Sequence, residues 1–182
     1  MVTHLLKKSY QLKDLKEINF KNLWGDHGVF TTMWIFGKPV KILFFKNHID
    51  NLLKSLKVYG IKKRFIRKDI FQIINQNISK KKNYNHLLRI ALNKKMISIS
   101  LRKKIKTKIK FNLKLVNLKR EKPQFKNLKY KKILFYLSKI NNSKSDIGLV
   151  YKKKILESGT SNILFIKNGK VFTPKKNYYE GN

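Results

Sequence analysis

The chain has 182 residues, of which 42% are hydrophobic and 12% aromatic, enough for the core of one ordinary domain or two small ones. It contains no cysteine, which excludes disulfide bonds, thiolate metal sites and a cysteine nucleophile, and no metal site is predicted. The net charge of +35 comes from 39 Lys and only five Arg against nine acids, which disfavours a specific nucleic-acid surface, where Arg is preferred.

The first segments with a clear pattern predict a hairpin followed by two helices. Residues 29–36 and 40–45 are rich in β-branched and aromatic side chains and flank the turn 37–39, which is typical of a β-hairpin. In 48–59 and 68–79, apolar residues recur at three- and four-residue spacing, so each segment predicts an amphipathic helix.

Three further strands are predicted before the composition changes. Residues 86–93 and 96–103 flank a short turn, and the second segment alternates apolar and polar side chains as a strand covered on one face does. Residues 111–118 alternate in the same way. The charged, proline-containing segment 119–127 is the best candidate boundary, so we expect a first domain over 1–120.

The second domain, expected over 121–182, is predicted to begin with a helix and to continue with strands. Apolar spacing over 133–140 indicates the helix. Asn168-Gly169 divides the alternating segment 162–174, and this dipeptide is a strong hairpin signal because both residues tolerate positive φ. The chain as a whole is therefore assigned to a mixed α/β (α+β) class with a β-rich second part.

Three local features carry residue types that are suited to chemistry. The turn Gly-Asp-His-Gly at 25–28 precedes a strand, Lys129 lies where a helix is expected to begin, and a run of small polar residues fills 157–162. Each feature is weak alone, because small polar runs between strands are usually turns. Their order along the chain is more informative than any one of them.

The segments that contain these features resemble, in order and spacing, the class IV aminotransferases, a family of pyridoxal-phosphate enzymes. The resemblance is carried by an opening turn with its hairpin and helix, an Arg-bearing strand, a lysine segment, and the ESGTSN strand with its hairpin (24–61, 87–93, 127–139 and 155–174). It implies a two-domain fold-type-IV enzyme that forms a homodimer. The family's next motif, a phosphate-binding turn, would begin at Gly181, so the second domain is expected to be incomplete.

The resemblance also implies which residues hold pyridoxal 5′-phosphate. Lys129 matches the catalytic lysine that binds the cofactor covalently and moves protons. Glu157 matches the carboxylate that keeps the ring nitrogen protonated. The small polar residues that follow are suited to the cofactor phosphate or ring through hydroxyl and backbone N–H groups, and these matched residues are Ser158, Gly159, Thr160 and Ser161.

The resemblance assigns Arg89, Phe30 and Thr32 to the substrate side. Arg89 matches a strand arginine that can bind a carboxylate in bidentate geometry. The sequence Phe30-Thr31-Thr32 is more similar to the aminodeoxychorismate lyases of the family. Leu134 stands where its branched-chain enzymes carry a tyrosine, which disfavours that substrate class.

Two positions depart from the family's pattern. Asn51 stands where the helix usually carries a phosphate-binding arginine, and Arg64 or Arg67 are the candidates to replace it. Lys132 stands where an asparagine often follows the catalytic lysine. These departures leave open a member of the family that has lost catalysis.

The sequence therefore supports three functions. The first is transfer of an amino group between an amino acid and a 2-oxo acid, and the second is aminodeoxychorismate lyase activity with the same cofactor. The third is a basic nucleic-acid-binding protein without catalysis, which predicts steep, salt-dependent RNA binding; non-specific binding of other anions is also expected at low salt. The sequence lacks both a signal-peptide-like apolar region and an apolar segment of about 20 residues, so we expect a cytoplasmic protein without a membrane partner.

Overall fold

The computed structural model describes residues 4–174, and the chain forms two compact units, Met1–Lys104 and Ile105–Asn182. The boundary between the units falls earlier than the domain boundary predicted at residue 120. The difference arises because strand β7 (Asn112–Asn117), expected in the first domain, pairs with a strand of the second unit. Each unit has its own sheet and helices, so the mixed α/β class predicted from the sequence is confirmed.

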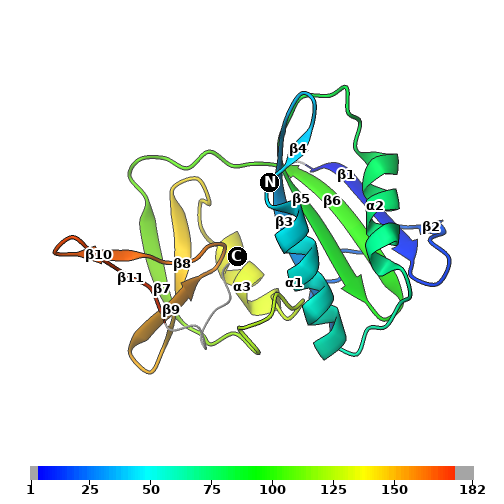
Figure 1. Cartoon of the computed structure of the whole chain (residues 1–182). Helices are drawn as coiled ribbons and strands as arrows, with labels where there is room; N and C mark the ends of the chain where they lie inside the picture. Colours follow the sequence, from blue (N-terminus) through cyan, green and yellow to red (C-terminus); the bar gives the residue numbers. More distant parts are fainter. Residues whose placement is uncertain (1–3, 175–182) are drawn as a thin grey trace. The chain divides into compact units, whose positions relative to one another are not determined.

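The first unit is built on a six-stranded sheet with the order β2-β1-β6-β5-β3-β4, in which all neighbouring strands are antiparallel (Figure 1). Its strands are β1 (His4–Gln11), β2 (Glu17–Ile18), β3 (Gly28–Gly37), β4 (Lys41–Ile42), β5 (Tyr84–Asn93) and β6 (Met96–Lys103). The sequence analysis missed β1 and β2. In β1 the adjacent pair Lys7-Lys8 interrupts the alternation, and the pairing with β6 shifts register between His4 and Leu6.

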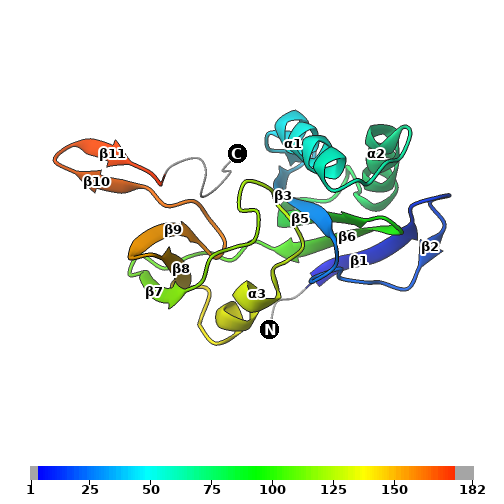
Figure 2. The same ribbon diagram turned by 90° about the horizontal axis from the view of Figure 1, so that it is seen from below.

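Two helices, α1 (Phe45–Val58) and α2 (Ile66–Asn77), cover one face of this sheet (Figure 2). Both helices were predicted, and their buried apolar residues repeat at the expected spacing: Ile49, Leu52, Leu56, Ile70, Ile73 and Ile74. The strand predicted over 40–45 contracts to the two residues of β4. Phe44 adopts a left-handed conformation with φ of 48°, and α1 begins at the next residue.

Alternation along β3, β5 and β6 gives this sheet two different faces. The face under the helices is apolar and carries Met33, Ile35, Leu88, Ile90, Leu92, Ile97, Ile99 and Leu101, each at most 2% exposed. The opposite face is mixed: it carries Thr32, Arg89 and Ser100 together with the apolar Phe30, Trp34 and Leu87. Among the residues described, no helix of the first unit lies on that second face (Figure 2).

The second unit contains a three-stranded sheet with the order β7-β8-β9, formed with β8 (Ser145–Tyr151) and β9 (Lys154–Ser158). β7 and β8 are parallel, so the chain crosses over between them through helix α3 (Lys131–Ser138). The helix buries Ile133 and Leu137 against Ile147 and Leu149 of β8. Leu134 is partly buried against the same cluster.

The last described strands form the predicted hairpin, β10 (Phe165–Lys167) and β11 (Lys170–Phe172). Its turn residues Asn168 and Gly169 have φ values of 50° and 70°, the positive values that the dipeptide favours. The turn that the family resemblance places at Gly181 lies outside the described residues. Within the described part of the chain, none of the helices is both long and apolar enough to cross a bilayer.

Candidate functional site

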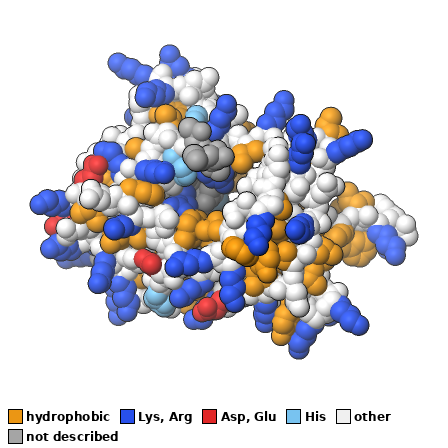
Figure 3. All heavy atoms as spheres, turned by 180° about the vertical axis from the view of Figure 1, so that it is seen from behind, with side chains coloured by type: hydrophobic (Ala, Val, Ile, Leu, Met, Phe, Trp, Pro, Cys, Tyr) orange, Lys and Arg blue, Asp and Glu red, His pale blue; other side chains and the backbone are white. Residues whose placement is uncertain are grey.

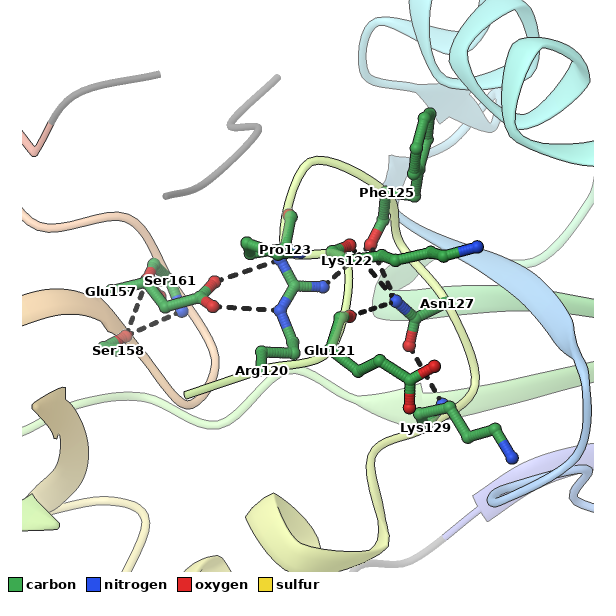
Figure 4. Close-up of polar contacts among 10 residues, drawn as sticks. All are labelled: Arg120, Glu121, Lys122, Pro123, Phe125, Asn127, Lys129, Glu157, Ser158 and Ser161. Carbon is green, nitrogen blue, oxygen red and sulfur yellow. Dashed lines mark hydrogen bonds and ion pairs between the residues drawn. The ribbon is translucent and has the colours of Figure 1, made fainter. Parts of the chain in front are cut away.

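A buried ion pair in the second unit joins Arg120, which follows β7, to Glu157 of β9. The Nε atom of Arg120 donates to Oε1 of Glu157 at 2.9 Å, and its Nη2 atom donates to Oε2 at 3.1 Å (Figure 4). The two side chains are 3% and 9% exposed, the lowest values for any ion pair in the described residues. This two-point geometry is the strongest that an arginine and a carboxylate form.

The environment of Glu157 acts on its ionisation in two opposing directions. Burial raises the pKa of the Glu157 carboxyl, whereas the charge and hydrogen bonds of Arg120 lower it. Each carboxylate oxygen retains a lone pair beside the bond to Arg120, so Glu157 can still accept a hydrogen bond from a bound molecule. Arg120 therefore fixes the direction of the carboxylate without exhausting its acceptors.

The loop between β7 and α3 is attached to this ion pair. Arg120 also donates from Nη1 to the carbonyl oxygen of Phe125 at 2.9 Å and from Nη2 to that of Pro123. Asn127, which is fully buried, donates from Nδ2 to the carbonyl oxygen of Glu121 at 2.7 Å. The loop 120–127 is consequently held to β9 through Arg120 and closed on itself through Asn127.

Two lysines near this loop differ in their surroundings. The backbone N–H of Lys129 donates to Oδ1 of Asn127, but its side chain is exposed and points away from the Arg120–Glu157 pair (Figure 4). Lys126 is partly buried, and desolvation together with the charge of Arg120 lowers its pKa. A lowered pKa increases the fraction of neutral amine, the form that attacks carbonyl carbon. Lys126 thus differs from Lys129 in its burial and in its lowered pKa, and the role predicted for Lys129 stays a prediction.

The small polar turn after Glu157 is organised by Asp146 of β8, which is 5% exposed. Its Oδ2 atom accepts from the Ser158 hydroxyl at 2.9 Å, the Thr160 hydroxyl at 2.6 Å and the Thr160 backbone N–H at 3.3 Å. Gly159 lies so close to β8 that a Cβ atom there would be 2.7 Å from the Ile147 side chain. The turn thus requires both the carboxylate and the absence of a side chain.

The backbone N–H groups of this turn are hydrogen-bonded within the protein. The backbone N–H of Gly159 donates to the Ile147 carbonyl, and that of Ser161 donates to the Ser158 hydroxyl. With Thr160 bonded to Asp146, the backbone donors of all three residues are used inside the protein. This arrangement supports the position of Glu157, and the hydroxyl of the exposed Ser161 lies at the surface. The roles that the resemblance implies for residues 158–161, toward the cofactor phosphate or its ring, stay predictions.

The three residues predicted for the substrate side lie together on the sheet of the first unit. Thr32 of β3 is directly opposite Arg89 of β5, and Phe30 is opposite Ala91, two residues further along the same face. This is the face without helices. The Arg89 guanidinium lies 4.4 Å from the ring centroid of Trp24, and the Trp24 and Phe30 rings make an edge contact at 4.8 Å.

The candidates to replace the missing phosphate-binding arginine are engaged elsewhere. Asn51 lies on α1, as predicted from the sequence. Arg67 of α2 forms an ion pair with Asp50, and the Arg64 guanidinium lies 4.7 Å from the ring centroid of Phe65. Each of these two guanidinium groups therefore already contacts a side chain of the first unit.

Three residues of this site were missed in the sequence analysis: Arg120, Lys126 and Asp146. Arg120 was in the segment interpreted as a domain boundary, although it is one of only five arginines. Asp146 is one of only nine acidic residues, and scarcity was the usable signal. Nothing in the local sequence distinguishes Lys126 from its lysine neighbours. The 39 lysines supply most of the positive charge, and on the face shown in Figure 3 the Lys and Arg side chains are scattered.

A family model matches most of the chain. The family model described as amino-transferase class IV matches residues 28–181, which cover most of both units and include every predicted site residue. A search of curated proteins finds no match.

Solved structures show the same fold at low sequence identity. A branched-chain aminotransferase from Thermoproteus uzoniensis, crystallised with norvaline, superposes with a TM-score of 0.73 and 13% identity, over 97% of this chain and 70% of that one. A putative 4-amino-4-deoxychorismate lyase from Legionella pneumophila gives 0.66 and 18%, over 84% and 64%. The PLP-bound form of a hypothetical aminotransferase from Mycobacterium tuberculosis gives 0.67 and 13%, over 94% and 72%.

Proposed function

We propose, from the premise that the chain belongs to the class IV aminotransferase family, that it moves an amino group between an amino acid and a 2-oxo acid with pyridoxal 5′-phosphate as cofactor. The observation that carries the proposal is the buried Glu157, aligned by Arg120 beside the loop of Lys126 and Lys129. A pyridine nitrogen needs a fixed carboxylate, and a carbonyl needs an amine.

The residues present fit this cofactor at two of its three binding points. Glu157 has free acceptor capacity for a protonated ring nitrogen, and the partly buried amine of Lys126 has a lowered pKa. The phosphate is less well provided for, because the backbone donors of residues 159–161 are already bonded within the protein. When bound, pyridoxal phosphate supplies an electron-withdrawing ring that stabilises negative charge at the substrate carbon next to the amino group.

The protein's own groups would each perform a defined task. Glu157 holds a proton on the ring nitrogen, and Arg120 keeps Glu157 ionised so that it can accept that hydrogen bond. The lysine amine accepts and returns the proton of the substrate carbon. Asp146 keeps the turn after Glu157 rigid, so that the carboxylate does not rotate away from the ring.

Aminodeoxychorismate lyase activity is the second candidate for the same site. It is favoured by Phe30 and Thr32, which lie on the face of the sheet that also carries Arg89. The fold resembles a putative lyase and branched-chain aminotransferases to a similar degree. Supplying aminodeoxychorismate in one assay, and amino acid and oxo acid pairs in another, separates the two: pyruvate released without an amino acceptor indicates the lyase.

The decisive experiment traps the cofactor on its lysine. The full chain is mixed with pyridoxal phosphate, reduced with borohydride, digested and mapped by mass spectrometry. We expect one dominant adduct on Lys126 or Lys129, and we expect the Glu157→Gln variant to lose it. Lys131, exposed and close in sequence, provides a matched control in the variant Lys131→Met, which should keep the adduct.

Two results would contradict the proposal. Adducts spread over many lysines and unchanged in Glu157→Gln would mean that the cofactor reacts with exposed amines only. A dominant adduct on a lysine outside 126–129 would leave Glu157 without a cofactor to serve. A dominant adduct on Lys126 rather than Lys129 would support the function and correct the lysine assigned from the sequence.

A further inference from the structure

Two hairpins of the second unit are closed by turns of the same backbone conformation but of different composition. In the first, Tyr151 of β8 pairs with Lys154 of β9, so Lys152 and Lys153 alone form the turn, with φ values of 48° and 60°. In the second, between β10 and β11, the turn is an Asn-Gly pair with φ values of 50° and 70°. Positive φ at both positions is what Asn-Gly favours and what lysine disfavours.

The two lysines of the first turn therefore occupy backbone positions that are unfavourable for them. In the left-handed region, the Cβ atom of an L-residue approaches the following carbonyl oxygen, a contact that glycine avoids. The composition of the chain does not explain the choice, because the chain contains 18 Asn and the other hairpin carries Asn-Gly at the same positions. A residue retained in an unfavourable conformation indicates a role for its side chain.

A tyrosine and four lysines lie together at this end of the sheet (Figure 1), and we call Lys119, Tyr151, Lys152, Lys153 and Lys154 the basic tip. The parallel pairing of β7 with β8 brings Lys119, two residues after β7, beside the turn. Its Nζ atom lies 5.0 Å from the centroid of the Tyr151 ring, and that of Lys152 lies 5.7 Å from it. All four lysines are exposed, and the tyrosine is partly exposed.

The positive charge of the basic tip is not neutralised by the protein. Among residues 4–174, none of its four lysines forms an ion pair. The described part of the second unit has three acidic residues: Asp146 and Glu157 are buried and bonded within the candidate site, and Glu121 lies in the loop 120–127. The counterions of these lysines are therefore solvent ions, which a bound polyanion would release.

The residue types of the basic tip fit single-stranded nucleic acid. Lysine is a compact point charge that attracts phosphate without reading shape or sequence. A tyrosine ring beside such charges offers a surface on which any base can stack. Binding to a bilayer surface, by contrast, requires apolar side chains that enter the headgroup region, and the basic tip has no aliphatic residue.

We propose that the basic tip binds single-stranded nucleic acid without regard to base sequence, with phosphates at the lysines and one base stacked on Tyr151. This inference goes beyond the proposed function and does not depend on it. The basic tip uses none of the residues assigned to the cofactor or substrate, and binding there requires no cofactor.

The test measures binding of a short fluorescein-labelled oligouridylate to the full chain by fluorescence anisotropy over a series of salt concentrations. The double variant Lys152→Asn/Lys153→Gly gives this hairpin the turn of the other one. Its slope of log Kd against log salt should fall by about 1.4, since each phosphate contact on a single strand contributes about 0.7. Its urea midpoint should rise, because the new residues suit positive φ. Weaker binding by a more stable protein excludes misfolding as the cause.

The matched control is Lys80→Asn/Lys81→Gly, which removes two exposed lysines from a turn of the first unit. It should keep the salt slope of the wild type. Equal losses in the two double variants would mean that the oligouridylate responds only to net charge, which would overturn the proposal. Loss of binding to phosphatidylserine vesicles in Lys152→Asn/Lys153→Gly, with oligouridylate binding unchanged, would assign the basic tip to membranes instead.

The stacking contact is tested separately with Tyr151→Leu. This variant should bind the oligouridylate about tenfold more weakly than the wild type does, because the base loses its aromatic partner. Binding of polyphosphate, which has no bases, should not change. Equal weakening for the oligouridylate and polyphosphate, or no weakening for either, would remove the base from the proposed site. If oligouridylate binding behaves as expected while the borohydride adduct fails to form, the basic tip stands and the proposed function falls.

Discussion

The buried or partly buried arginines of the two units differ in whether they have a carboxylate partner among the described residues. In the second unit, Arg120 is buried with a carboxylate at two-point distance and two backbone carbonyls around it. In the first unit, Arg89 and Arg102 are diagonal neighbours on the sheet, and among residues 4–174 neither has a carboxylate partner and the buried Nε atom of Arg89 has no acceptor. In a chain with only nine acids, the location of each carboxylate is informative.

The difference separates an arginine that is part of a buried ion pair from arginines that have no carboxylate partner among the described residues. Breaking a buried ion pair leaves an uncompensated charge, so Arg120 should be costly to remove. Removing an unpaired, partly buried arginine relieves its repulsion from the neighbouring arginine and removes the free-energy cost of its desolvation. Replacing an arginine by methionine should therefore lower the free energy of unfolding in the second unit and raise it in the first.

The largest effect is expected from Arg120→Met, which leaves Glu157 buried without its partner. The free energy of unfolding should fall by about 3–5 kcal/mol, measured by urea titration at pH 7. The double variant Arg120→Met/Glu157→Leu should recover much of that loss, because both charges are then absent. A double variant as unstable as the sum of its single variants would show that the pair does not interact.

The pH dependence of Arg120→Met sharpens this prediction. The pKa of Glu157 is already raised by burial and should rise further without Arg120. The folded state then binds a proton more tightly than the unfolded state does, so stability falls as pH rises from the unfolded pKa to the folded pKa. Acidification through that interval should therefore reduce the difference between the variant and the wild type.

A smaller loss is expected from Asp146→Asn, which replaces the acceptor of the Ser158 and Thr160 donors by a group that also donates. The free energy of unfolding should fall by about 2 kcal/mol, and the Thr160 amide should exchange with deuterium faster. Asp50→Asn, which removes a surface ion pair with Arg67, should change stability by less than about 0.5 kcal/mol. Equal effects of the two substitutions would contradict the supporting role of Asp146.

Arg102→Met is expected to raise the free energy of unfolding, whereas Arg120→Met is expected to lower it. The Arg102 side chain is partly exposed, so solvent reduces the repulsion from Arg89, and stability should rise by no more than about 1 kcal/mol. Urea midpoints of the two proteins provide the measurement. A lower urea midpoint for Arg102→Met than for the wild type would contradict the expected difference between Arg102 and Arg120.

The smallest effect is expected from His4→Gln, and only in acid. The pKa of His4 is lowered in the folded state, so the unfolded state binds the proton first and stability falls as pH drops below about 6.5. His86, whose pKa is also lowered, acts in the same direction. The difference between wild type and His4→Gln isolates the contribution of His4: the variant should lose less stability between neutral pH and the folded pKa of His4.

Local signals predicted a large part of the fold. The hairpin at Asn168-Gly169 and the helices over 45–58 and 66–77 depend on turn chemistry and apolar spacing, which are contained in short segments. The sequence did not reveal that β7 pairs with β8, because that pairing spans the helix between them. β1 was missed for a local reason, because the adjacent pair Lys7-Lys8 interrupts its alternation of apolar and polar side chains.

In the candidate site, too, local sequence signals were informative and contacts between distant segments were not. Glu157 was singled out because it matches the family's motif and is one of only nine acidic residues; the structure shows that it is buried, and its role toward the cofactor stays a prediction. Arg120 was missed because its carboxylate partner is 37 residues away. Lys129 was assigned from the family resemblance alone, and that role stays a prediction; burial, which the sequence does not display, distinguishes it from the neighbouring Lys126.

The position of β1 at the interior of the first sheet has a consequence for biosynthesis. His4–Gln11 leaves the ribosome well before its main partner, β6, which ends at Lys103. The six-stranded sheet therefore cannot close while the nascent chain is short, and the edge of β1 remains available to chaperones or to other chains during that delay. Slowing translation beyond residue 103 should favour correct closure, whereas a pause before it should favour aggregation.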